Sequence, residues 1–89
     1  MAREETVCVI IAAKNAEKTI GKAVGSALAQ PEVAEVVVVD DGSDDRTMAA
    51  AAAANDASGR LDILGFVQNR GPSAARNRAI AVSRAPLIA

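Results

Sequence analysis

The segment "VVVVDDGSDD" (residues 36–45) sets four consecutive valines directly against four carboxylates grouped around a Gly-Ser pair. The run "AEVVVVD" (34–40) is short, apolar and rich in β-branched residues, which predicts a strand buried on both faces. Ligands of open parallel sheets bind at the carboxyl ends of the strands. The pattern therefore predicts an apolar floor with an acidic rim, and we expect Asp40 and Asp41 to face one cleft beside the neighbouring strand's tip.

Three other apolar runs also predict strands. "TVCVIIAA" (6–13) predicts a second strand buried on both faces, "LDILGFV" (61–67) predicts a third strand, and "APLIA" (85–89) begins a fourth. With helical segments between them, the order is β-α-β-α-β-α-β. This alternation predicts an α/β fold with a mainly parallel sheet, and residues 1–89 are expected to form one small domain or part of a larger one.

Helical spacing marks the three segments between the strands. Their expected bounds and end residues are 15–30 with Asn15 as N-cap, 43–58 with Ser43 as N-cap and Gly59 at its end, and a third helix opening at Pro72. Asp44 and Asp45 would lie in the first turn of the second helix, where the helix dipole favours anions. The side chains expected to face the sheet are Ile20, Ala23, Val24, Ala27, Leu28, Ala75, Ala79 and Val82.

Composition excludes several classes of function. Ten basic and eleven acidic residues give a net charge of −1, which argues against a nucleic-acid partner. Cys8 is the single cysteine and histidine is absent, so the sequence contains neither a disulfide framework nor a zinc-binding set nor a Ser-His or Cys-His dyad. Acidic residues precede the first apolar run, which is unlike a signal peptide, so a cytoplasmic location is expected.

The acidic segment fits some ligands better than others. A calcium loop counted from Asp40 would need glutamate at the twelfth position, which is Ala51. The turn "AAKNAEK" (12–18) has no glycine, so it is neither a dinucleotide fingerprint nor a Walker loop. Two interpretations stay open: a carboxylate that binds the polar N–H groups of a base or the hydroxyls of a ribose, and a solvated helix start.

The motifs, taken together, resemble the nucleotide-binding half of family-2 glycosyltransferases, which are inverting enzymes of the GT-A fold. The matching segments are "VCVIIAAKNAE" (7–17), "SALAQ" (26–30), "EVVVVDDGS" (35–43) and "NRGPSAARN" (69–77). They extend over most of the chain, and "VVDDGS" together with "ARN" at this separation is a specific signal.

The resemblance implies a set of donor-binding residues. Asp41 would bind the base of a UDP- or GDP-sugar, and Asp40 would either assist it or close the turn. Arg76 would pair with the diphosphate or, alternatively, tie to one of these aspartates. Glu17 matches the family's acidic position, although a first-turn acid explains it equally. The full implied set is Ala12, Ala13, Lys14, Asn15, Glu17, Asp40, Asp41 and Arg76.

Two features depart from the family pattern. Ala12 and Lys14 replace the proline and the tyrosine that follow the first strand, and the tyrosine normally stacks on the base. The family's D-x-D motif, which holds Mg²⁺ or Mn²⁺, and its general base follow the strand begun at 85–89. The chain ends before both, so no catalytic or metal-binding residue is assigned and no metal is expected on this chain alone.

The resemblance therefore implies the donor-binding half of an inverting glycosyltransferase, inactive by itself. The parent enzyme would use a metal ion and a saccharide or lipid-linked acceptor, in the cytoplasm or at the inner face of the membrane. Two alternatives stay open. One is a binding or assembly module that self-associates through an exposed sheet edge, and the other is a nucleotidyltransferase-like domain.

Overall fold

The computed structural model describes residues 7–66, 71–82 and 87–88, in which strands and helices alternate along the chain. The elements are β1 (Val7–Ala13), α1 (Ile20–Leu28), β2 (Val33–Asp41), α2 (Thr47–Ala53), β3 (Leu61–Phe66), α3 (Pro72–Val82) and β4 (Leu87–Ile88). The predicted α/β fold is thus confirmed. The predicted strand positions 6, 67, 85, 86 and 89 lie outside the described residues.

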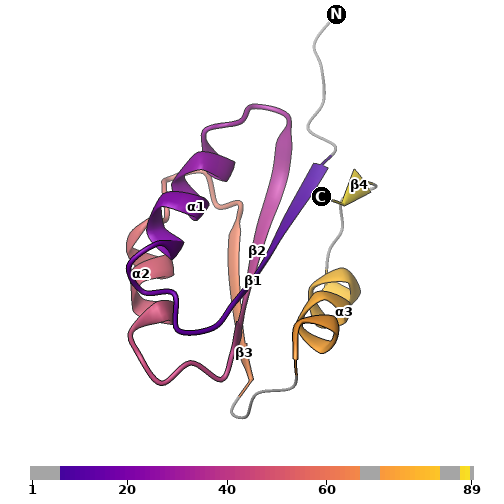
Figure 1. Ribbon diagram of the computed structural model, residues 1–89. Helices are drawn as coiled ribbons and strands as arrows, with labels where there is room; N and C mark the ends of the chain where they lie inside the picture. The colour runs from indigo at the N-terminus through magenta and orange to yellow at the C-terminus, as the bar shows by residue number, and fades with distance from the viewer. Residues whose placement is uncertain (1–6, 67–70, 83–86, 89) are drawn as a thin grey trace, which may run out of the picture.

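The sheet is parallel in every pair, with the strand order β3-β2-β1-β4 (Figure 1). Asp40 of β2 lies opposite Ala13 of β1 on one side and Gly65 of β3 on the other. The carboxyl ends of these three strands are therefore level. Helices α1 and α2 cover one face of the sheet, and α3 covers the other (Figure 1).

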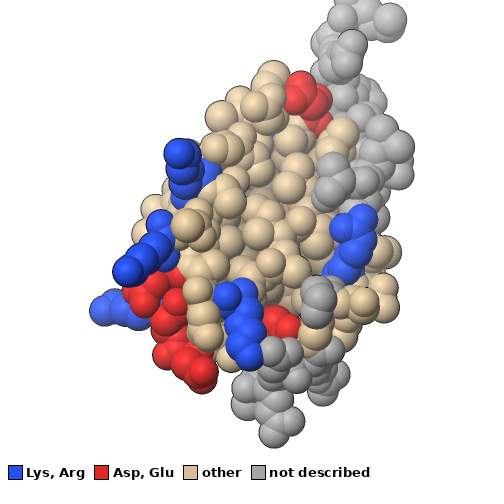
Figure 2. All heavy atoms as spheres, viewed as in Figure 1, with Lys and Arg blue, Asp and Glu red and all other residues tan. Residues whose placement is uncertain are grey.

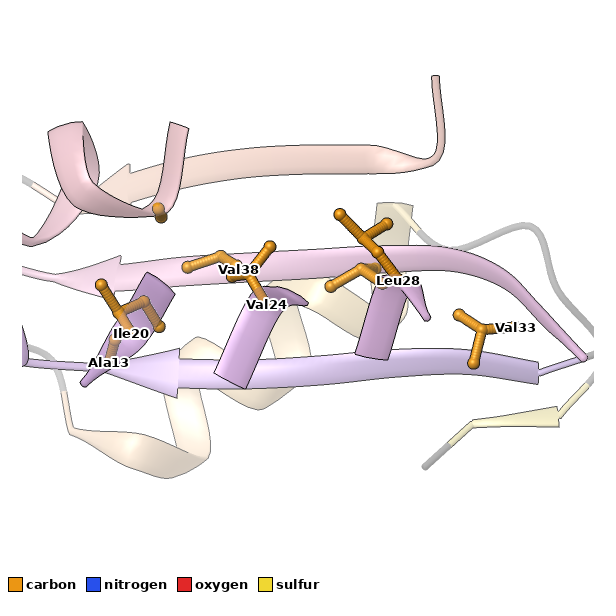
Figure 3. Packing of buried hydrophobic residues seen from close by; sticks show 8 residues of the cluster. Ala13, Ile20, Val24, Leu28, Val33 and Val38 are labelled. Atoms are coloured by element: carbon orange, nitrogen blue, oxygen red, sulfur yellow. The ribbon is translucent and has the colours of Figure 1, made fainter. Parts of the chain in front are cut away.

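The core consists of two apolar layers separated by β2, whose Val36 to Val39 are all fully buried. On the α1 and α2 side it contains Ala13, Ile20, Val24, Leu28, Val33, Val36, Val38 and Ala51, and on the α3 side Cys8, Val37, Val39, Ala75 and Ala79. Figure 3 shows Ile20, Val24 and Leu28 of α1 pointing into the first layer. The predicted burial of β2 on both faces is confirmed.

Strand β1 is less buried than predicted. Cys8 and Ala13 are buried, but the residues between them are half-buried and Ala12 is exposed. The reason is that β4 pairs with Val7 and Cys8 alone among the described residues. The carboxyl half of β1 thus lacks a described neighbour on that side.

The predicted helix-facing residues are mostly confirmed. Ala75 and Ala79 of α3 are fully buried, as are Ile20, Val24 and Leu28 of α1 to within a few per cent. Ala27 is half-buried, whereas Ala23 is exposed because it lies at the margin of the buried stripe. The side chain of Val82 lies outside the described residues.

The predicted starts of the first two helices were placed too early. Helix α1 begins at Ile20 and not at residue 15, because Asn15 has a φ of 51° in the left-handed region, which no helical residue adopts. Helix α2 begins at Thr47 and ends at Ala53, well before Gly59. Ser43 does not cap it, because Arg46 is the residue that precedes the helix and the Ser43 oxygen accepts the N–H of Asn15 instead.

Candidate functional site

The two aspartates at the end of β2 point to opposite faces of the sheet. Side chains alternate along a strand, so Asp40 shares the face of Val38, under α1 and α2, and Asp41 shares the face of Val39, under α3. The expectation that both face one cleft is therefore wrong. A strand's pleat allows only one of two consecutive residues to line a given side.

Asp41 lies on the α3 side and is only 5% exposed. Its Oδ2 accepts a hydrogen bond of 2.9 Å from the backbone N–H of Gly71, which directly precedes α3. Gly71 has a φ of 88°, a conformation that residues with a Cβ rarely adopt. The end of β2 is thus joined to the start of α3, and Phe66 lies opposite Asp41 on β3.

Asp40 lies on the other side and closes the turn after β2. It is 5% exposed, and its Oδ1 accepts a short hydrogen bond from the Ser43 hydroxyl. Gly42, between them, has a φ of 72°, which lets the backbone reverse within three residues. This contact agrees with the turn-closing alternative for Asp40, although the donor is a hydroxyl and not a backbone N–H.

The predicted donor-binding residues of the β1–α1 loop lie beside this turn. Lys14, Asn15 and Glu17 are exposed. The backbone N–H of Asn15 donates to Ser43 Oγ at 2.8 Å, and the Asn15 carboxamide oxygen accepts from the N–H of Asp44 at 2.8 Å. A shallow surface pocket is lined by residues 15–19 together with Asp45.

Three residues that the sequence did not single out as a site complete this arrangement. They are Ser43, Asp45 and Thr47, each of which accepts a hydrogen bond from the β1–α1 loop. Because the loops after parallel strands meet at one edge of the sheet, their proximity follows from the fold. No local pattern, however, indicates which donor each side chain meets.

Asp45 carries the clearest electrostatic signature of this edge. The hydrogen bond from the Thr47 hydroxyl, supported by the backbone N–H groups of Glu17 and Thr47, lowers the pKa of the Asp45 carboxyl below its ordinary value of 3.8. These donors stabilise the charged form more than partial desolvation disfavours it. Asp45 is therefore ionised at neutral pH.

Arg76 lies on α3, away from the two aspartates that it was predicted to join as an alternative. Its side chain is exposed, and within the described residues the one ion pair is that of Arg60 with Asp56. The tie to Asp40 or Asp41 is therefore not formed, and the guanidinium is exposed to solvent. Asn77, next to it, is exposed as well.

Charged side chains gather at the end of the molecule where the strands finish. Figure 2 shows acidic atoms concentrated there with lysine and arginine beside them, while the face above is largely uncharged. Among residues 7–66, 71–82 and 87–88, no group of three or more carboxylate, cysteine or histidine side chains is arranged to hold a metal ion.

A parallel sheet with helices on both faces defines an α/β, Rossmann-like domain. The sequence model of glycosyl transferase family 2 matches residues 8–89, and the chain belongs to this family. This result favours the glycosyltransferase prediction over the nucleotidyltransferase alternative.

Two curated relatives come from Rhizobium meliloti (strain 1021). The succinoglycan biosynthesis protein ExoU is 62% identical over 82 residues, which are 92% of this chain and 24% of that protein. The succinoglycan biosynthesis protein ExoO is 46% identical over 84 residues, which are 93% of this chain and 24% of that protein. The chain thus spans about a quarter of the length of these relatives.

Solved structures share the same fold. The mannosyltransferase PcManGT from Pyrobaculum calidifontis, in complex with GDP-Man and Mn²⁺, matches with a TM-score of 0.84 and 24% identity over 98% of this chain and 27% of its own. Glucosyl-3-phosphoglycerate synthase from Mycobacterium tuberculosis, with Mn²⁺, UDP and glucosyl-3-phosphoglycerate, matches with a TM-score of 0.75 and 26% identity over 94% of this chain and 32% of its own. Both support the GT-A architecture.

No helix within the described ranges is both long enough and apolar enough to cross a bilayer.

Proposed function

We propose that this chain is the donor-binding portion of an inverting glycosyltransferase that uses a nucleotide sugar. The observation that carries the proposal is the family match over residues 8–89, with Asp41 nearly buried at the carboxyl end of β2. A carboxylate is an acceptor-only group, so Asp41 at this strand end is chemically suited to accept an N–H of a nucleobase. UDP and GDP sugars are the proposed donors, since nucleotides of both kinds occupy the similar solved structures.

The other predicted residues take distinct parts in this proposal. Ala12 and Ala13 end β1 beside β2, where small side chains leave room for a base. Lys14 and Arg76 are exposed cations that would meet the diphosphate from the two sides of the strand ends. Asp40, Asn15 and Glu17 shape the loops around it.

The whole reaction belongs to a longer protein in this proposal. There, a carboxylate base outside this chain would deprotonate an acceptor hydroxyl of a saccharide or lipid-linked sugar. The hydroxyl oxygen would form a bond to the sugar's anomeric carbon as the bond to the nucleotide diphosphate breaks. A divalent metal, if held by that protein, would stabilise the leaving diphosphate. A cytoplasmic location is likewise proposed.

The decisive test concerns Asp41. We expect UDP or GDP to bind the chain weakly and to shift amide NMR signals near residues 12–15 and 41. Asp41→Ala, and also Asp41→Asn, should abolish these shifts, because neither offers a carboxylate to the base. The Asn variant retains an oxygen for the Gly71 N–H and so separates base binding from the tie to α3.

Asp44→Ala is the matched control for this test. Asp44 is an exposed acid on the same rim, three residues after Asp41, and the hydrogen bond it makes to Asn15 uses its backbone N–H. Its loss should leave the titration unchanged. Equal titrations in wild type and both Asp41 variants would contradict the proposed role of Asp41, and no shift in wild type would contradict nucleotide binding altogether.

A second proposal concerns self-association. Within the described residues, β3 pairs with β2 alone, so the outer edge of residues 61–65 faces no other described strand. Open edges of this kind pair with other chains unless charge or cover prevents it. We propose a weak homodimer formed through β3, which is compatible with donor binding at the strand ends.

A further inference from the structure

The β1–α1 loop is held in place by side chains of the turn that follows β2. Three consecutive backbone N–H groups of the loop each donate to a different side chain. The pairs are Asn15 N to Ser43 Oγ at 2.8 Å, Ala16 N to Thr47 Oγ1 at 2.8 Å, and Glu17 N to Asp45 Oδ2 at 3.3 Å. The loop's conformation therefore depends on residues about thirty positions later in the chain.

Thr47 is the centre of this contact. It is fully buried, and its hydroxyl donates to Asp45 Oδ1 while accepting from Ala16 N. A hydroxyl has one donor and two acceptor positions, so the bond to Asp45 fixes the direction of its lone pairs towards the loop. Asp45 also accepts the Thr47 backbone N–H at 3.0 Å, which fixes the carboxylate in turn.

We propose that Asp45 and Thr47 are positioning residues for donor binding, which set the loop 14–17 in the conformation that receives the nucleotide. This inference rests on the proposed function, because it concerns affinity at that same site. Neither residue contacts the donor. A loop that is ordered before binding loses less conformational entropy on binding, so the donor binds more tightly.

The chain contains a natural control for local effects. Asp56 makes the same arrangement with Ser58: its Oδ1 accepts the Ser58 N–H at 2.9 Å and the Ser58 hydroxyl. This copy lies between α2 and β3, before the strand, and contacts no part of the β1–α1 loop among the bonds of the described residues. Asp56→Asn therefore removes the equivalent hydrogen-bonded carboxylate, together with its ion pair to Arg60, at a place remote from the strand ends.

The experiment compares Thr47→Val, Thr47→Ser, Asp45→Asn and Asp56→Asn with wild type. Hydrogen exchange of the Ala16 and Glu17 amides reports the loop, NMR titration with UDP and GDP reports affinity, and urea unfolding reports global stability. We expect Thr47→Val and Asp45→Asn to speed exchange and weaken nucleotide affinity by about fivefold each, the factor for one ordinary hydrogen bond. Thr47→Ser should restore both, and Asp56→Asn should change neither.

The outcomes separate this inference from the proposed function. Faster loop exchange without weaker affinity, or equal affinity losses in Asp45→Asn and Asp56→Asn, would overturn the positioning role. A wild-type chain that binds neither nucleotide would overturn the proposed function and the donor part of this inference with it. Unchanged loop exchange in Thr47→Val would overturn the contact itself, whatever the nucleotide result.

Discussion

Asp45 and Asp56 are chemically matched carboxylates whose charge is stabilised by nearby donors. Hydroxyl donation from Thr47 lowers the pKa of Asp45, and hydroxyl donation from Ser58 lowers the pKa of Asp56, each below the ordinary value of 3.8. A lowered folded-state pKa means that the carboxylate contributes stability above about pH 4, and that this contribution disappears as pH falls through the lowered pKa.

The lowered pKa values of these two carboxyl groups predict how the stability of the protein depends on pH. The free energy of unfolding should fall between about pH 5 and pH 3 in wild type, and the fall should be shallower in Asp45→Asn and in Asp56→Asn. Urea unfolding over that range measures it. A wild-type profile that is flat there, or steeper profiles in the variants, would contradict the assigned hydrogen bonds.

At the level of single residues, the sequence predicts where a residue lies in a strand or helix better than it predicts which partners its side chain binds. Asp41 was expected at the end of a buried strand, and it lies there. Asn15 was expected to cap a helix, yet it adopts a φ of 51° because its N–H and its carboxamide oxygen both bind the turn after β2. The competing partners are 28 and 29 residues away, so no local pattern could reveal them.

At the level of elements, Arg60 joins three backbone segments at the end of the sheet opposite the strand tips. Its guanidinium donates to the carbonyl oxygens of Leu28 at 2.5 Å, Gln30 at 3.3 Å and Val33 at 2.7 Å. The carbonyls at a helix carboxyl end have no partners within the helix, and α1 has no basic residue of its own in its last turn. Arg60, directly before β3, therefore supplies the missing donors.

Replacing Arg60 tests this junction. Arg60→Lys keeps the charge but loses the planar fork that reaches several acceptors, so we expect a loss of about 1–3 kcal/mol in the free energy of unfolding. Arg46→Lys, at an exposed position, should change it by less than about 0.5 kcal/mol. Urea unfolding of the two variants measures the difference, and equal effects would show that the fork contributes nothing.

The spacing of the apolar residues predicted the type and the order of the strands and helices, but it did not predict the lengths of the helices. Both α1 and α2 start later than their polar flanks suggested. Residues 43–46 look like a helix start because they combine a serine with two acids, which is also the composition of a turn. Their side chains bind the neighbouring loop, and this tertiary contact outweighs local capping preference.

For the whole molecule, the parallel order and an exposed sheet edge were predictable from the alternation of strands and helices, whereas the identity of the edge strand became evident only from the strand order. Asp62 is an exposed acid within the open edge strand β3. Charges on edge strands reduce edge-to-edge pairing. If the proposed dimer forms through β3, Asp62→Val should strengthen association, measured by sedimentation velocity over a concentration series. If wild type and Asp62→Val were both monomeric at every concentration, the proposed interface would be contradicted.

The final prediction concerns catalysis by the chain alone. The chain spans about a quarter of the length of its curated relatives, and among its described residues no cluster suitable for a metal ion is present. In the proposed reaction, the base that activates the acceptor and the groups that stabilise the leaving diphosphate lie elsewhere in a longer protein. We therefore expect the purified 89-residue chain to bind nucleotide without transferring sugar.

Release of UDP or GDP from the corresponding sugar donors, followed with and without added Mn²⁺, measures this directly. A longer relative of the same family, assayed in parallel, shows that the donors and conditions are competent. Turnover by the isolated chain that disappears in Asp41→Ala would show that the strand-end edge carries the catalytic groups itself. The division of roles proposed between this chain and the rest of the enzyme would then have to be abandoned.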